Sequence, residues 1–208
     1  MNILEILQII IRNPGLHMRW LNTLSYLENC GAKLIAESQH PIIVEEELLK
    51  HAAEEFRHAY FFKSQIQKIS NMNLRYYSPD ELLGGYSSLF YLSKLNLKIS
   101  RFLKTKQISY KDYKIYSYLL VTYAIEVRAL EIYQLYQNLI KEHQMPFSIS
   151  NVIREEKHHL KEIQADLNKS PARFFIKETL AIESDLFTAF YSGICESVQL
   201  KLACSSRL

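Results

Sequence analysis

The pattern of hydrophobic and polar positions predicts helices along almost the whole chain. Apolar residues recur at intervals of three and four, as they do on one face of an α-helix, and no sustained strand-like alternation occurs. Breaks fall at Pro, Gly and polar clusters, among them Asn13-Pro14-Gly15 and Met145-Pro146. We therefore predict an all-α protein. The expected helices span about residues 2–12, 16–38, 41–69, 80–104, 110–143, 149–168 and 173–200.

Length and composition predict one domain over residues 1–208. The chain is 48% hydrophobic and 23% charged, in the ordinary range for a folded globular protein. Its net charge of +3 comes from interspersed acids and bases, so we expect no nucleic-acid partner. The three cysteines are widely spaced, and no stretch is long and apolar enough for a membrane span. These features predict reduced thiols and a cytoplasmic location.

Two segments of the chain carry the same motif, EExxH. In a helix, residues i and i+3 lie on one face about 5–6 Å apart. Glu55 with His58, and Glu156 with His159, could therefore each grip a metal ion from one side. The pair formed by Glu155 and His158 also has the Glu-x-x-His spacing, one residue out of register. Because that pair falls beside the apolar stripe of its helix, we favour Glu156 and His159.

Four glutamates each occupy the middle of an apolar stripe on a different predicted helix. They are Glu28, Glu55, Glu126 and Glu156. Such stripes face a protein core, and burying an isolated carboxylate is very costly. Two divalent cations would balance the four negative charges, and neutral imidazoles would complete the coordination without adding charge. The pattern therefore predicts a two-metal site inside a helical bundle.

The order Glu, Glu-x-x-His, Glu, Glu-x-x-His resembles the ferritin-like di-iron carboxylate superfamily. The resemblance covers about residues 16–168 and implies a four-helix bundle with a long crossover. The helices at about 80–104 and 173–200 would be additional to this core. The superfamily pattern implies that Glu55 and Glu156 bridge two iron ions, with manganese as the alternative metal. Terminal ligands would be Glu28 and His58 on one ion, and Glu126 and His159 on the other.

Other residues on the same faces are candidates for outer roles. His51 lies one turn before Glu55, where it could hydrogen-bond to a ligand, serve as a seventh ligand, or simply be a buried histidine. Tyr123 and Tyr133 flank Glu126 and could hydrogen-bond to ligands, although core filling is the more common role of such tyrosines. Gly31 interrupts a predicted helix, which leads us to expect that another part of the protein packs closely against it.

The resemblance leaves three functions open. The first is an O₂-activating di-iron oxidase or oxygenase, an oxidoreductase that uses O₂ or peroxide on a small-molecule substrate. The second is a ferroxidase or peroxide-scavenging protein of ferritin or rubrerythrin type. The third is a metal-free helical interaction protein. A homodimer is compatible with each. An apolar tunnel that reaches the metal ligands would favour the first function.

Overall fold

The computed structural model describes residues 2–40, 42–70 and 74–205 of the chain, and these residues form helices joined by loops and turns, with no β-strand among them. The prediction of an all-α protein is thus confirmed. The helices are α1 (Ile3–Arg12), α2 (Pro14–Ser38), α3 (Glu46–Ile69), α4 (Tyr86–Lys104), α5 (Tyr110–Glu142), α6 (Ser150–Lys169), the 3₁₀ helix η1 (Pro171–Phe175) and α7 (Ile176–Ser205).

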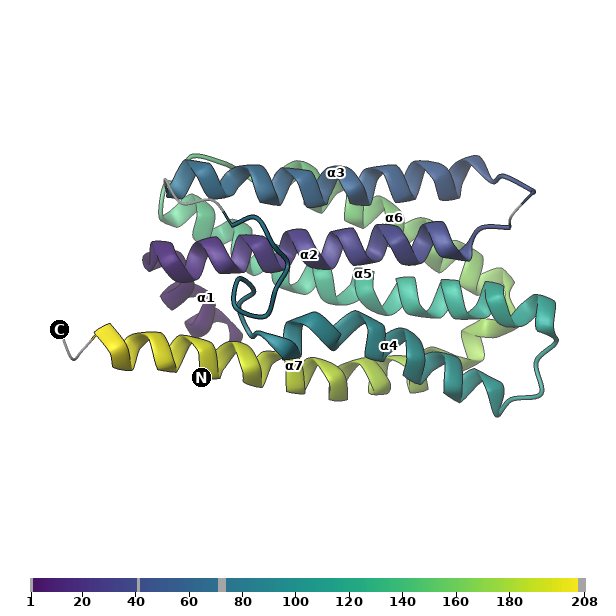
Figure 1. The fold of residues 1–208 in the computed structure, drawn as a ribbon. Helices are drawn as coiled ribbons and strands as arrows, with labels where there is room; N and C mark the ends of the chain where they lie inside the picture. Colours follow the sequence, from purple (N-terminus) through teal and green to yellow (C-terminus); the bar gives the residue numbers. More distant parts are fainter. Residues whose placement is uncertain (1, 41, 71–73, 206–208) are drawn as a thin grey trace.

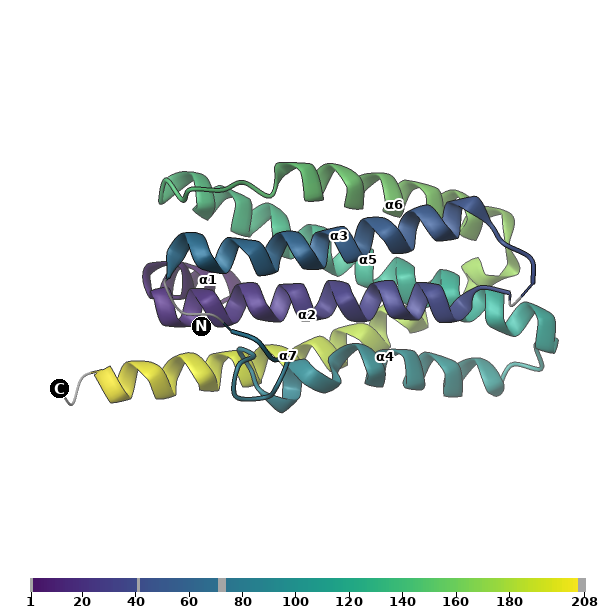
Figure 2. The ribbon, with the colours of Figure 1, turned by 45° about the horizontal axis from the view of Figure 1, so that its top comes forward.

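Helices α2, α3, α5 and α6 run side by side as a bundle (Figures 1 and 2). Contacts are most extensive between α2 and α3 and between α5 and α6. The segment that leaves α3 passes through α4 before α5 begins, so α4 belongs to a long crossover. Helices α4 and α7 pack against each other along one side of the bundle, and α1 lies against α2, α5 and α7. One connected hydrophobic core contains side chains from α1 to α7.

Local sequence signals explain where the first two helices start. The Asn2 side chain accepts a hydrogen bond from the Glu5 amide at 2.9 Å, and the Glu5 carboxylate accepts one from the Asn2 amide at 2.8 Å. This reciprocal arrangement is a capping box. Asn13 then caps α2 by accepting from the Leu16 amide at 3.1 Å, with Pro14 in the first turn. The predicted break at Asn13-Pro14-Gly15 is thus the cap of α2.

Helix α3 begins later than the predicted boundary at residue 41. Pro41, expected in its first turn, lies outside the described residues. The His40 imidazole accepts hydrogen bonds at Nδ1 from the amides of Ile42 and Ile43, at 3.2 and 3.0 Å. These bonds hold a turn, and the chain becomes helical only at Glu46.

Helices α4 and α7 also start after their predicted boundaries. Residues 79–85 form turns, and α4 starts at Tyr86 because Gly84 and Gly85 adopt positive φ angles of 86° and 54°. The expected helix at about 80–104 is therefore shorter. The expected helix at about 173–200 begins as the 3₁₀ turn of η1, becomes α-helical at Ile176 and extends to Ser205.

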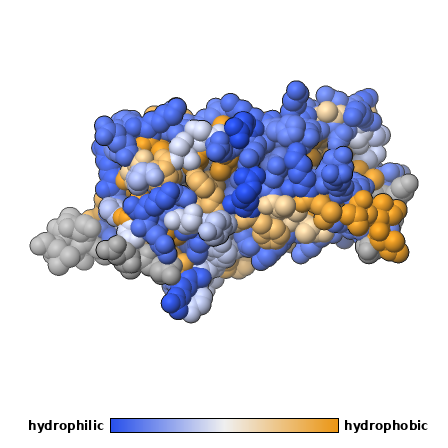
Figure 3. All heavy atoms as spheres, turned by 90° about the horizontal axis from the view of Figure 1, so that it is seen from above, coloured by the Kyte–Doolittle hydropathy of each residue, from blue (hydrophilic) through white to orange (hydrophobic). Residues whose placement is uncertain are grey.

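The surface face seen in Figure 3 is mainly hydrophilic, with apolar side chains gathered at one end.

Gly193 allows α7 to approach the start of α4. A Cβ atom built on Gly193 would collide with Ser87 Oγ and would lie 2.8 Å from Ser87 Cβ and 3.1 Å from the Gly84 carbonyl oxygen. Gly31, by contrast, has no other part of the protein within 4 Å of such an atom. The expectation that something packs closely against Gly31 is therefore wrong. None of the described helices combines the length and apolarity that a membrane crossing requires.

Replacing Gly193 or Gly31 by alanine should change the free energy of unfolding in opposite directions. Gly193→Ala should lower the free energy of unfolding by about 1–3 kcal/mol, because the added methyl overpacks the α4–α7 contact. Gly31→Ala should raise it by about 0.5–1 kcal/mol, because alanine is the better helix former and meets open space. Urea denaturation of both variants measures the changes. A loss of stability in Gly31→Ala would contradict the open geometry.

Candidate metal centre

The four predicted carboxylates meet at the centre of the bundle. Glu28 comes from α2, Glu55 from α3, Glu126 from α5 and Glu156 from α6, and each is at most 8% exposed. His58 and His159 lie with them and are 1% and 2% exposed. The structure thus brings together all six residues that sequence periodicity selected.

Donor atoms in this cluster form two groups. Within each group, the atoms all lie within 4.8 Å of one another. One group consists of Glu28, Glu55, His58 and Glu156, and the other of His51, Glu55, Glu126 and His159. Glu55 belongs to both groups. Glu156 also faces both, because its Oε1 lies 2.9 Å from His58 Nδ1 and its Oε2 lies 3.2 Å from His159 Nδ1. Two positions for a cation therefore lie side by side, with Glu55 and Glu156 between them.

Two further glutamates hold the histidines from outside the cluster. The Nε2 atom of His159 on α6 lies 2.8 Å from Glu54 on α3, and the Nε2 atom of His58 on α3 lies 2.7 Å from Glu155 on α6. Each Nδ1 atom is thereby directed at the central carboxylates. Sequence reasoning missed these roles for Glu54 and Glu155. The doubled glutamate in both EExxH motifs was the available signal.

This arrangement also distinguishes the two registers of the second motif. Glu156 and His159 are buried in the cluster, whereas the His158 side chain is 54% exposed and pairs with Glu162 at 3.2 Å. Glu155 contributes to the site only through His58 and is also paired with Arg57 at 3.0 Å.

His51 contacts the central carboxylates directly. Its Nε2 atom is 3.2 Å from Glu55 Oε1 and 3.3 Å from Glu126 Oε1, and its Nδ1 atom is 3.3 Å from the Tyr118 hydroxyl. His51 therefore stands among the donor atoms of the second group. No residue of α6 repeats this role, because the equivalent position one turn before Glu156 is Val152.

The two tyrosines named from the sequence differ in position. The buried Tyr133 hydroxyl donates a hydrogen bond to Glu28. Tyr133 therefore contacts the group that contains Glu28, although on α5 it lies beside Glu126, which belongs to the other group. Tyr123 is half-buried against the core, and among the described residues no hydrogen bond joins it to the cluster.

Protons balance the cluster's charge when only protein groups are present. Burial, followed by repulsion from the other carboxylates, raises the pKa values of Glu28 and Glu126 well above the usual range. Burial acts in the same sense on Glu55, but its hydrogen bonds with His159, His51 and His58 outweigh burial and lower its pKa. The arrangement favours neutral acids at Glu28 and Glu126.

The histidines carry the compensating positive charge. Burial alone lowers the pKa of His58, but hydrogen bonds with Glu156 and Glu55 outweigh burial and raise that pKa to about 12. For His159, too, burial lowers the pKa, but hydrogen bonds with Glu156 and Glu55 outweigh burial and raise the pKa to about 10. Both imidazoles are therefore protonated at neutral pH in this arrangement, beside two ionised carboxylates.

The donor set could also hold metal ions. Four buried atoms of the cluster make no well-directed hydrogen bond. Three of them nevertheless have a close neighbour, because His58 Nδ1 and Glu156 Oε1 lie 2.9 Å apart and Glu55 Oε1 lies 3.1 Å from His159 Nδ1, and the fourth is Glu126 Oε2. Buried polar atoms are rarely left unsatisfied. A cation in each group would coordinate these atoms and replace the protons. Both buried His/Glu groups have the composition of a metal site.

A cavity lies directly against this cluster. All four central carboxylates form part of its wall, and the remaining lining is mainly apolar and comes from α2, α4, α5 and α7. Its empty space, counted out to the opening and including open solvent, is about 780 Å³, and about 70 Å³ is open to the centre of a water-sized sphere.

A buried ion pair closes one side of this cavity. Glu183 on α7 is 2% exposed and accepts hydrogen bonds from Arg128 on α5, at 2.9 and 2.8 Å, and from the Tyr91 hydroxyl on α4 at 2.5 Å. The Arg128 guanidinium also lies 3.9 Å from the ring centre of Phe187. Helices α4, α5 and α7 are thereby fixed together over the cavity.

Comparison of the chain with protein-family models, with curated proteins and with solved structures found no match. The case for a metal centre therefore depends on the geometry of the chain itself.

Neighbouring histidines on α6 offer a matched test of metal binding. His159→Ala should lose the two metal equivalents per chain, because His159 faces the cluster, whereas exposed His158→Ala should keep both. Glu55→Ala should also lose both equivalents, because Glu55 belongs to both groups. Elemental analysis of the purified proteins measures the stoichiometry. Two equivalents retained in both His159→Ala and Glu55→Ala would refute the proposed ligand set.

The outer glutamates should affect metal affinity without abolishing it. We expect Glu54→Ala to weaken metal binding about 10- to 100-fold, because His159 would lose the carboxylate that orients its ring. Glu162→Ala is the control, since Glu162 pairs with the outward-facing His158. Competition with a chromophoric chelator measures both affinities, and equal affinities would exclude an orienting role for Glu54.

Proposed function

We propose that this protein is a non-haem di-iron redox protein of the ferritin-like type, with a manganese–iron pair as the alternative. Its function in this proposal is that of an oxidase or oxygenase that uses O₂ to oxidise a small organic substrate. The observation that carries the proposal is the apolar cavity whose wall contains all four buried carboxylates. A protein that only stores or oxidises iron needs a path for ions, and a largely apolar approach suits an organic molecule better.

Iron bound by these ligands would supply the electrons that reduce O₂. The chain's own residues would perform the supporting tasks. Glu28, Glu55, Glu126 and Glu156 would compensate the metal charge, and carboxylates can change between terminal and bridging positions as that charge varies. Glu54 and Glu155 would keep the two imidazoles in orientation, and the hydrogen bond from Tyr133 would fix Glu28. The aliphatic and aromatic wall would exclude water from the reacting substrate.

Aerobic oxidation of the iron-loaded protein tests the proposal. Protein loaded anaerobically with two equivalents of Fe(II) should consume O₂ when air is admitted and develop the near-ultraviolet absorption of ferric iron bound to carboxylates. His159→Ala should show neither change above that of free iron. An oxygen electrode and an optical spectrum provide the two measurements.

The alternatives predict other outcomes of the same experiment. Repeated Fe(II) additions that accumulate far more than two ferric ions per chain would favour ferroxidase and storage activity. Protein that takes up no iron or manganese would support a metal-free interaction protein. Either outcome would contradict the proposed oxidase or oxygenase.

A further inference from the structure

We propose that the cavity beside the carboxylates binds the hydrocarbon part of an amphipathic, uncharged substrate, and that Gly31 keeps the cavity open for it. This inference deepens the proposed function and rests on it, because it assigns the substrate class of the same site.

Gly31 lies on the cavity wall within one turn of a central carboxylate. It follows Glu28 by three residues on α2 and lines the cavity together with Ile35 one turn later. A Cβ atom at Gly31 would meet nothing within 4 Å. Glycine inside a helix costs about 1 kcal/mol relative to alanine. Since no close packing requires this glycine, the free space is the structural feature that it provides.

The charges on the cavity wall do not favour an ionic ligand. Arg128 is the one basic side chain among the described residues that line the cavity, and Glu183 and Glu131 neutralise it at 2.8 and 2.5 Å. The acidic lining residues are the central carboxylates themselves. A carboxylate or phosphate inside this cavity would therefore lack a free cation, whereas a hydrocarbon chain or ring would meet Leu, Ile, Val and aromatic side chains.

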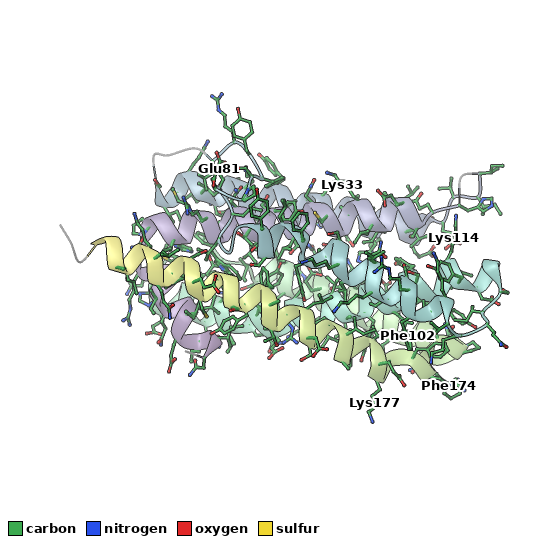
Figure 4. The ribbon with its side chains drawn as sticks, turned by 60° about the horizontal axis from the view of Figure 1, so that its bottom comes forward. Lys33, Glu81, Phe102, Lys114, Phe174 and Lys177 are labelled. Carbon is green, nitrogen blue, oxygen red and sulfur yellow. The ribbon has the colours of Figure 1, made fainter. Side chains whose placement is uncertain are left out.

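A groove with more polar residues in its wall adjoins the apolar cavity. The two share three wall residues, Leu34, Val121 and Thr122. Beyond them the groove is lined mainly by hydroxyl and amide side chains, with one acid, Glu37, and one base, Lys114. Figure 4 shows Lys114 toward the end of the bundle, at the start of α5.

These features together define the ligand. Its apolar part would pass the three shared wall residues, Leu34, Val121 and Thr122, and lie against the carboxylate cluster. Its polar end would remain in the groove, where hydroxyl and amide groups can hydrogen-bond to it and the charges of Glu37 and Lys114 oppose each other. A neutral alcohol, aldehyde or amide with a hydrocarbon chain has this chemistry.

A series of linear alcohols tests the assignment directly. Trp20 lines the cavity and is the only tryptophan of the chain, so its fluorescence reports occupancy. Titration with 1-hexanol, 1-octanol and 1-decanol should give saturable changes, and the dissociation constant should fall about fourfold per added methylene until the cavity is full. Gly31→Leu, whose side chain enters the open space, should weaken 1-decanol binding at least about tenfold.

Two further variants serve as a control and as a graded substitution. Ala36→Leu adds a leucine on the exposed side of the same helix and should bind 1-decanol as the unaltered protein does. Gly31→Ala fills less of the cavity and should show an intermediate affinity, so a graded effect remains measurable if Gly31→Leu folds poorly. The inference is overturned if the unaltered protein gives no saturable response, or if both Gly31 variants bind all three alcohols with unchanged affinity.

Metal stoichiometry separates this inference from the proposed function. The unaltered protein and Gly31→Leu should both bind two metal equivalents, because Gly31 donates no ligand. Two equivalents without alcohol binding would reject the substrate assignment alone. Alcohol binding that depends on Gly31, in a protein that takes up no iron or manganese, would reject the redox function and leave a binding pocket for apolar molecules.

Discussion

Burial of four carboxylates at one point is the constraint around which the bundle is organised. Each of α2, α3, α5 and α6 contributes one glutamate, and the apolar stripes that bring the helices together force these glutamates to meet. An ionised carboxylate in a dry interior is unfavourable unless it is paired, and mutual repulsion adds to the cost. The fold is therefore compatible only with a cluster whose charge is compensated from within.

The structure indicates how that compensation is shared. The pKa values of Glu28 and Glu126 are raised, which favours two neutral acids, and the raised pKa values of His58 and His159 favour two imidazolium ions beside Glu55 and Glu156. Four protons thus carry the charge that two divalent cations would carry. In this arrangement Glu126 Oε2 has no hydrogen-bond partner, and three other buried atoms of the cluster make close contacts that are poorly directed as hydrogen bonds. Buried acids alone would therefore not require a metal, and the convergence of the donor atoms into two compact groups is the stronger argument for one.

Helical periodicity was sufficient to select the central residues, because a lone glutamate in an apolar stripe is a local and readable signal. Glu54 and Glu155 could not be assigned in this way, since they act on histidines of the opposite helix and lie beside the stripe. The Glu183 contact with Arg128 was likewise invisible, because it depends on how α7 packs against α5. Helix starts at Glu46 and Tyr86 were displaced by a histidine-stabilised turn and by two glycines with positive φ, which hydrophobic periodicity does not encode.

The same packing that assembles the cluster also leaves space beside it. Helix α2 packs chiefly on α3, and α5 chiefly on α6, so the two pairs meet across the carboxylates with less contact than exists within each pair. Tyr91 of α4 and Phe187 of α7 cover the resulting gap, and the Glu183 ion pair holds these helices in place. Larger side chains along α2 could have filled the gap and stabilised the core. Glycine at position 31 instead forgoes both helix propensity and buried area, and that double cost is the reason to interpret the space as a binding site.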